Sequence, residues 1–327
     1  MEKSNVEILF TWIDHTTETI QQHADEPYLD SLAIALEWLF YEETSEMDDD
    51  IARQKIQKAL KDIKLDQYTT EDIQKAVQFA ILKGMKDSTQ PQHLMTPDTV
   101  ALLVGYLAEK LNKKKEKLRV FDPACGTGNL LTTVIKQLKQ QTEVFGSEVD
   151  STLIKLALLN ANLQKQNVEF FHQDSLRPFL LDPVDLVVAD LPVGYYPDDV
   201  RASDYELQAA EGHSYAHHLF IEQSMHYTKE AGYVIFVIPD FLFDSDQADK
   251  LQAFLQKNAH IIGVLSLPES AFKSEKNGKS ILVLQKKGDH TSGPKQPLLV
   301  KLPSFKNAKA MDDILDQING WFANYLS

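Results

Sequence analysis

Short apolar runs alternate with amphipathic stretches through most of the chain, a pattern typical of a sheet covered by helices on both faces. The first run ends at Val120 and Phe121. Six further candidate strands follow, at residues 143–150, 168–176, 184–197, 232–243, 261–267 and 280–285. The pattern predicts an α/β fold with a doubly wound sheet, closed by a short C-terminal helix near residues 309–325.

The beginning of the chain follows a helical period instead. Apolar side chains recur at helical spacing in residues 29–43, 51–63 and 71–85. The acidic run 42–50 between the first two of these segments is typical of a solvated loop. We therefore expect two domains: an α-helical N-terminal domain over residues 1–90, and a domain over residues 91–327 that carries the sheet and the C-terminal helix.

The segment FDPACGTGNLL, residues 121–131, carries the clearest chemical signal. It has the pattern of a buried strand that breaks into a glycine turn and then opens a helix. Asp122 stands at the carboxyl end of the strand, and Gly126 and Gly128 leave room for a ligand close to the backbone. The segment therefore predicts a turn that binds a nucleotide-type cofactor.

Two cofactor classes compete for this turn, a dinucleotide and S-adenosylmethionine. The dinucleotide fingerprint requires a third glycine three residues after the second, where this chain has Leu131. A pyrophosphate needs no acid in the turn, whereas Asp122 is well placed to meet a cationic amino group such as that of a methionine moiety. The turn therefore favours S-adenosylmethionine.

Acidic residues also end the next two candidate strands. Glu148 lies 20 residues beyond Gly128, the usual distance for a carboxylate that accepts hydrogen bonds from ribose hydroxyls. Asp174 ends the third strand and is suited to accept from an exocyclic amine, such as that of adenine. Three acids at three successive strand ends are stronger evidence for a cofactor site than any one of them.

The fourth apolar run, residues 184–197, carries the motif Asp190-Leu191-Pro192-Val193. It resembles the (Asn/Asp/Ser)-Pro-Pro-aromatic motif of amino-methyltransferases. With QHLMTPDTVA (residues 92–101) upstream and GYVIFVIPDFLF (residues 232–243) downstream, the chain resembles adenine-specific DNA methyltransferases, above all the modification subunits of type I restriction systems and their short Gram-positive relatives. The resemblance covers about residues 90–287 and is most specific in the cofactor half.

The resemblance implies the class I S-adenosylmethionine-dependent methyltransferase fold, with a Rossmann-like, seven-stranded sheet whose last strand is antiparallel. It also implies methyl transfer to the exocyclic amino group of adenine in DNA, where Asp190 and the Leu191 carbonyl accept hydrogen bonds from the amine. The implied catalytic positions are Asp190, Leu191 and Pro192, and we add Tyr195 and Tyr196, which follow the motif, as further candidates. The implied cofactor positions are Thr96, Asp122, Ala124, Gly126, Gly128, Asn129, Glu148, Val149, Asp174, Ser175 and Asp190.

Two departures from the motif concern the substrate. Leu191 replaces the first proline, and Val193 replaces the aromatic residue on which an extruded base stacks. Tyr195 or Tyr196 is close enough to take over the stacking role, because Gly194 permits an unusual turn. Both tyrosines could equally pack a loop.

Charge bears on the expected partner. The net charge is −15, and residues 1–90 hold 19 acidic and nine basic residues, a net charge of −10. Phosphate contacts supply most non-specific affinity for DNA, so an acidic chain without room for a sequence-reading domain suggests a partner protein that supplies recognition. The basic residues Lys273, Lys276, Lys279 and Arg201 are candidates to line an entrance for nucleic acid.

Composition bears on membrane association, on the role of the cysteine and on metal binding. No apolar run reaches the roughly 18 residues that a membrane span needs, and residues 1–10 lack a signal-peptide pattern, so we expect a cytoplasmic protein without a membrane partner. Cys125 is the single cysteine and is expected to be a small residue packed in the turn. The histidines show no metal-binding spacing, so we expect no metal site.

Three functions stay open at this point. The first is an adenine-specific DNA methyltransferase. The second is a methyltransferase of RNA bases or of a protein amide, since these acceptors use the same hydrogen-bond geometry. The third is a cofactor-binding interaction protein with weak or no catalysis, which the acidic N-terminal domain and the altered Leu191 and Val193 would suit.

Overall fold

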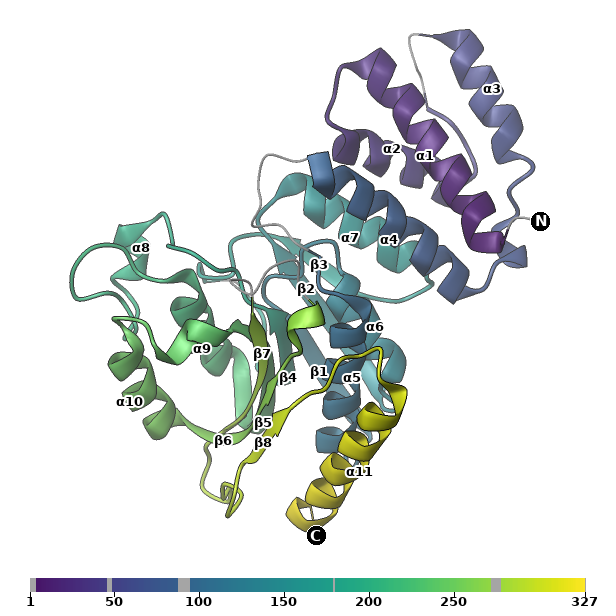
Figure 1. The fold of residues 1–327 in the computed structure, drawn as a ribbon. Coiled ribbons are helices and arrows are strands. Elements are labelled where there is room, and N and C mark those ends of the chain that lie inside the picture. The colour runs from purple at the N-terminus through teal and green to yellow at the C-terminus, as the bar shows by residue number, and fades with distance from the viewer. Residues whose placement is uncertain (1–3, 46–48, 88–94, 179, 272–277, 327) are drawn as a thin grey trace.

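The computed structural model describes residues 4–45, 49–87, 95–178, 180–271 and 278–326. Figure 1 shows two parts, a group of N-terminal helices and a larger body in which helices flank a central sheet. None of the helices within the described residues is long and apolar enough to cross a membrane.

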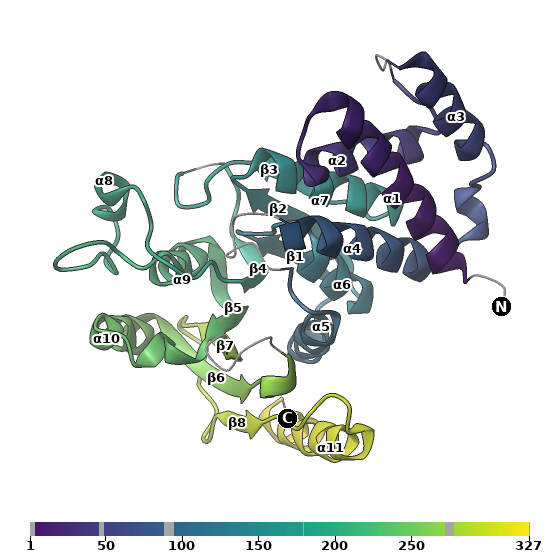
Figure 2. The ribbon, with the colours of Figure 1, turned by 45° about the horizontal axis from the view of Figure 1, so that its top comes forward.

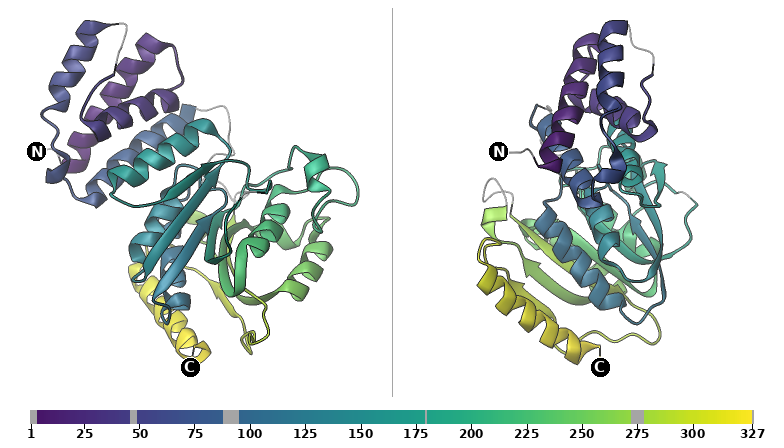
Figure 3. Two further views of the ribbon diagram at one scale, coloured as in Figure 1. Left: turned by 180° about the vertical axis from the view of Figure 1, so that it is seen from behind. Right: turned by 90° about the vertical axis from the view of Figure 1, so that its right-hand side faces the viewer.

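Four helices form the N-terminal part. Their bounds are α1 (Asn5–Ala24), α2 (Tyr28–Tyr41), α3 (Asp50–Leu60) and α4 (Thr70–Asp87), with a 3-10 turn, η1 (Leu65–Gln67), before the last. Their shared core also takes in Leu156, Leu159 and Leu163 from α7 (Ser151–Leu163) of the sheet body. Because burial of these leucines ties the two parts together, α4 and α7 lie side by side in Figures 1 and 3.

One sheet of eight strands forms the centre of the larger body. The strands are β1 (Lys117–Asp122), β2 (Gln141–Glu148), β3 (Glu169–His172), β4 (Val184–Asp190), β5 (Thr228–Pro239), β6 (Ala259–Ser266), β7 (Lys279–Lys286) and β8 (Leu298–Lys301). Their order is β3-β2-β1-β4-β5-β7-β6-β8, and β7 runs antiparallel to both of its neighbours. The order reverses between β1 and β4, so the carboxyl ends of these parallel strands open a crevice of the kind in which α/β proteins bind ligands.

Alternate side chains of the central strands enter two separate cores, as the two-residue period of a strand requires. On β4, Leu186 and Val188 join one core, whereas Val187 and Ala189 join the other. Figure 2 shows α5 (Asp98–Asn112), α6 (Asn129–Gln137) and α11 (Ala308–Tyr325) on one face, and α9 (Ala216–Tyr227) and α10 (Ala248–Asn258) on the other. Three short elements, α8 (Asp199–Ala202), η2 (Asp240–Phe243) and η3 (Glu269–Ala271), complete the body.

The sequence prediction of an α/β sheet fold with an N-terminal helical part and an antiparallel seventh strand is confirmed. The predicted number of seven strands is wrong, because β8 adds an eighth strand that pairs in parallel with β6. Pro297 and Pro303 flank this four-residue strand, and so short a run has no detectable period. The sequence prediction also named no separate helix where α1 lies, and its fourth and fifth strands extended past Asp190 and Pro239.

Candidate active site

The turn after β1 has the backbone that its glycines require. Gly126 and Gly128 have φ angles of 53° and 77°, in the left-handed region that side chains other than glycine's rarely adopt. A Cβ at Gly128 would lie 3.3 Å from the Cβ of Ala157 on α7, whereas a Cβ at Gly126 would meet nothing within 4 Å. The turn is therefore closed against α7 at Gly128 and faces open space at Gly126.

Asp122 is the last residue of β1 and directly precedes this turn. Its side chain is almost fully buried, and its Oδ1 accepts a hydrogen bond from the Ala124 amide at 3.0 Å. Burial raises the pKa of the Asp122 carboxyl well above its usual range, and the nearby charges of Glu148 and Asp190 raise it further. A buried acid surrounded by further acids is suited to receive a cationic group.

Backbone amides hold Glu148 under the turn. Its Oε2 accepts from the Gly126 amide at 3.0 Å, and its Oε1 accepts from the amides of Val149 and Asp150 at 2.8 and 2.9 Å. The Val149 side chain is exposed. These bonds fix the carboxylate beside Asp122, at the edge that the sequence predicted.

Asp174, after β3, connects the third strand to the motif segment. Its Oδ1 accepts from the Leu176 amide at 2.9 Å, and its Oδ2 accepts from the Tyr196 hydroxyl at 2.5 Å. The Ser175 hydroxyl donates to the Pro123 carbonyl at 2.6 Å, which holds this loop against the glycine turn. The three predicted acids therefore lie at one edge of the sheet, as expected from parallel strands.

Asp190 ends β4 beside this acidic edge, with both carboxylate oxygens bonded. Thr96 Oγ1 donates to Oδ2 at 2.9 Å, and Lys279 Nζ donates to Oδ1 at 2.6 Å. The next residue, Leu191, is buried, and its amide donates to the Val237 carbonyl on β5 at 3.1 Å. Pro192 is exposed beyond it. Of the predicted cofactor positions, Thr96 thus contacts the motif carboxylate directly.

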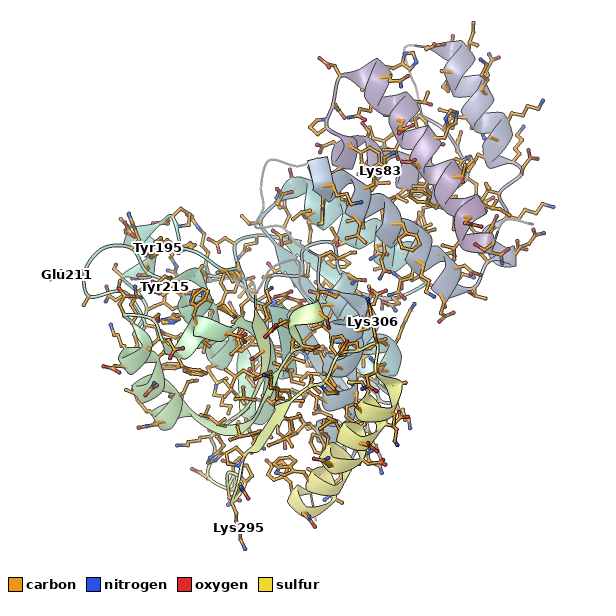
Figure 4. All side chains as sticks on the ribbon, viewed as in Figure 1. Lys83, Tyr195, Glu211, Tyr215, Lys295 and Lys306 are labelled. Carbon is orange, nitrogen blue, oxygen red and sulfur yellow. The ribbon has the colours of Figure 1, made fainter. Side chains whose placement is uncertain are left out.

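The two motif tyrosines have different surroundings. Tyr196 is buried, and its hydroxyl bonds to Asp174, so its ring packs the loop. Tyr195 is 60% exposed and stacks on Tyr215, with ring centroids 4.9 Å apart and planes at 14°. Figure 4 shows these two side chains next to one another at the edge of the molecule. Between the two tyrosines, only Tyr195 presents an accessible ring.

A pair of buried histidines behind the motif was not identified from the sequence as part of the site. His217 and His218 are fully buried, and their rings meet edge to face at 4.9 Å. Burial lowers the pKa of His217 to about 3 and that of His218 to about 4, so both rings are neutral at neutral pH. His217 faces the backbone of Pro192 and stacks on Tyr215, a contact between distant segments that no local pattern signals.

Asn129, another predicted cofactor position, has its side chain turned inward. Its amide nitrogen donates to the Thr96 carbonyl at 2.8 Å, and its oxygen accepts from Gln78 on α4. Gln78 also donates to Asp98 at 2.7 Å. This network joins the starts of α5 and α6 to the N-terminal helices and holds Thr96 beside Asp190. A cofactor contact by Asn129 stays a prediction.

We expect Asn129→Ala to lower the free energy of unfolding by about 1 to 3 kcal/mol, the range for breaking a buried hydrogen-bond network. The variant leaves the buried Thr96 carbonyl without its side-chain donor. Urea denaturation followed by circular dichroism measures this change. Asn5→Ala, at an exposed bond on α1, is the matched control and should change stability by less than about 0.5 kcal/mol. Equal stabilities of the two variants would contradict a structural role for the network.

The described residues of the proposed basic entrance give it no support. Lys273 and Lys276 lie outside the described residues. Arg201 donates to the Leu176 carbonyl and to Asp204, both at 2.7 Å, so its guanidinium is held within the chain. Lys279 lies at the start of β7 and pairs with Asp190. Arg201 and Lys279 are therefore occupied by internal partners.

Comparison with known proteins agrees with this geometry. Residues 84–310 match the family model of the N-6 DNA methylases, and residues 7–85 match that of the YtxK N-terminal helical domain. The Bacillus subtilis (strain 168) protein YtxK is 47% identical over 98% of this chain and 99% of its own length. A crystal structure from Listeria monocytogenes, described as a class I S-adenosylmethionine-dependent methyltransferase, is 43% identical, with a TM-score of 0.91 over 97% of this chain and 99% of that one.

The methylase subunit of the type I restriction enzyme MpnII from Mycoplasma pneumoniae is also similar, with 26% identity over 59% of this chain but only 40% of that subunit. The glycine turn, the open space at Gly126 and the buried acid Asp122 fit S-adenosylmethionine, the cofactor that the family uses. The chain therefore belongs to the N-6 DNA methylase family and has the fold of the class I S-adenosylmethionine-dependent methyltransferases.

Proposed function

We propose that this protein transfers a methyl group from S-adenosylmethionine to the exocyclic amino group of adenine in DNA. The observation that carries the proposal is the position of Asp190, whose carboxylate ends β4 directly beside the acidic edge formed by Asp122 and Glu148. A hydrogen-bond acceptor at this place can bind an amine next to the cofactor.

Three acids would hold the cofactor. Asp122 would pair with the methionine amino group, Glu148 would accept hydrogen bonds from the ribose hydroxyls, and Asp174 would accept from the adenine amine. The backbone of Ala124, Gly126, Gly128, Val149 and Ser175 would line the same edge. When bound, the cofactor supplies a sulfonium methyl group, which is an electrophile.

Asp190 and the Leu191 carbonyl would act on the acceptor. The lone pair of an adenine amine is delocalised into the ring, so the amine is a poor nucleophile. Hydrogen bonds from the amine to a carboxylate and a carbonyl draw the nitrogen toward tetrahedral geometry and restore its nucleophilicity. The bond from the Leu191 amide to Val237 fixes the peptide segment that presents this carbonyl.

Tyr195 would supply the stacking surface that Val193 lacks. Its exposed ring lies three residues beyond Pro192 and is supported from behind by Tyr215. Stacking on an aromatic ring contributes about 1 to 3 kcal/mol per base. A role for Tyr196 in stacking has less support, because its ring is buried.

The altered motif keeps other acceptors possible. Leu191 and Val193 replace the proline and the aromatic residue of the family motif, which favours a second candidate, methylation of RNA or of a protein amide. A third candidate, a cofactor-binding interaction protein with weak catalysis, is favoured by the ion pair that already occupies Asp190.

Sequence recognition would come from a partner protein. The related MpnII protein is a subunit of a type I restriction enzyme, and this chain spans less than half of its length. The net charge of −15 also opposes unaided binding to DNA. We therefore propose a basic partner that brings this chain, in the cytoplasm, to its nucleic acid.

Nucleoside mass spectrometry of DNA and RNA tests the proposed acceptor. Cells that carry the gene should contain N6-methyladenine in DNA that is lost on deletion, restored by the wild-type gene and not restored by the Asp190→Ala gene. Loss of a methylated base from RNA alone would replace DNA with RNA as the substrate. No change in either nucleic acid would refute base methylation.

A further inference from the structure

Lys279 occupies the place that the proposed function gives to the methyl acceptor. Its ammonium donates to Asp190 Oδ1 at 2.6 Å, while Thr96 holds Oδ2 at 2.9 Å. The Lys279 and Asp190 side chains are 20% and 14% exposed, so the pair is partly shielded from water. An acceptor amine that approaches Asp190 therefore meets a cation already bonded to it.

The antiparallel direction of β7 creates this contact. Lys279 is the first residue of β7 and lies opposite Pro239, the last residue of β5. On the other side of β5, Asp190 lies opposite Val237. The backbone of Lys279 is fixed as well, because its carbonyl accepts from the Leu267 amide at 3.1 Å. The ion pair is thus built by the sheet rather than by a chance surface approach.

The paired ammonium opposes the reaction as long as it stays in place. Methyl transfer gives the acceptor nitrogen a positive charge, which a neighbouring cation destabilises. The Lys279 ammonium also neutralises the Asp190 carboxylate, which would otherwise stabilise the positive charge on the acceptor nitrogen. Lysine has a long, flexible side chain, so its ammonium can move away while the β7 backbone stays fixed.

We propose that Lys279 selects the acceptor: its ammonium holds Asp190 until a nucleic-acid phosphate draws it away and frees the carboxylate for the amine. This inference rests on the proposed function. Phosphate is a strong partner for lysine, because the hydrogen bond is charge-assisted on both sides. A neutral amine without a phosphate, such as a free nucleoside, would leave Lys279 in place.

Cofactor binding tests the first half of the proposal without any methyl acceptor. S-adenosylmethionine carries a sulfonium charge that S-adenosylhomocysteine lacks, so the ratio of their Kd values reports the local charge. Lys279→Gln removes the positive charge that pairs with the Asp190 carboxylate. The variant should therefore bind S-adenosylmethionine, relative to S-adenosylhomocysteine, about 3- to 10-fold more tightly than the wild type does. Lys279→Arg should keep the wild-type ratio. The control Lys229→Gln removes a lysine that pairs with Asp185, near the start of β4, and should change nothing.

An oligonucleotide tests the second half. Single-stranded hexadeoxyadenylate at saturating concentration should shift the ratio of the wild-type protein toward that of Lys279→Gln and leave the variant unchanged. The same oligomer with an uncharged methylphosphonate backbone should have no effect on either protein. An identical ratio in wild type and Lys279→Gln, or a wild-type ratio that does not respond to the charged oligomer, overturns the proposal. Neither measurement needs methyl transfer, so a failure of the proposed function would appear separately, in the nucleoside analysis.

Discussion

Replacing Asp190 with alanine should lower the rate of methyl transfer by about 100- to 1000-fold, the usual effect of removing one positioned polar group from an active site. The carboxylate is proposed to contact the acceptor amine and not the cofactor, so S-adenosylmethionine should still bind. Transfer is measured with the nucleic acid that loses its mark in cells without the gene, and cofactor binding by calorimetry.

Two further variants separate chemistry from folding. Asp190→Asn should retain partial activity, because the amide oxygen can still accept one hydrogen bond. Asp204→Ala removes an exposed carboxylate that pairs with Arg201 and should transfer methyl groups at the wild-type rate. Methyl transfer by Asp190→Ala at the wild-type rate would exclude a chemical role for Asp190.

The elements predicted well from the sequence are those whose signal is local. The turn at Gly126 and Gly128 needs a backbone that glycine alone readily adopts, so two glycines after an apolar strand already specify it. Parallel strands end at the same edge, which is why Asp122, Glu148 and Asp174 could be expected to lie together.

The parts that the sequence did not reveal depend on contacts between distant segments. Lys279 directly precedes the strand predicted at residues 280–285 and was a candidate for a nucleic-acid entrance, but the pairing of β7 with β5 brings it to Asp190, 89 positions away in the chain. His217 and His218 have no metal-binding spacing, and their position behind Pro192 follows from the packing of α9. The edge strand β8 is too short to show a period.

The sequence also did not show which of the two motif tyrosines, Tyr195 or Tyr196, is buried. Neighbouring residues in an extended segment point to opposite sides, so one of Tyr195 and Tyr196 had to face inward. The sequence did not decide which. The bond from Tyr196 to Asp174 and the isolated bridge between Tyr195 and Tyr215 decide it in the structure.

Asp122→Asn should weaken S-adenosylmethionine binding by about 10- to 100-fold, the loss expected for a charge-assisted hydrogen bond of 1.5 to 3 kcal/mol. The amide can still accept from the Ala124 amide, so the turn should keep its shape. The wild-type affinity should also fall as pH is lowered through the raised pKa of Asp122, because the cationic amino group of the cofactor needs the ionised carboxyl. In the variant this part of the pH dependence should disappear.

The same substitution should stabilise the protein without cofactor. Burial raises the pKa of Asp122 above its ordinary value near 3.8, so the folded state holds a proton that the unfolded state releases in the interval between the two values. Stability therefore falls as pH rises through this interval, and above it the folded protein must bury a charge. Asparagine removes that cost, and thermal unfolding at pH 7.5 should show a Tm higher by roughly 2 °C or more. A lower Tm together with unchanged cofactor affinity would mean that Asp122 supports the fold and not the cofactor.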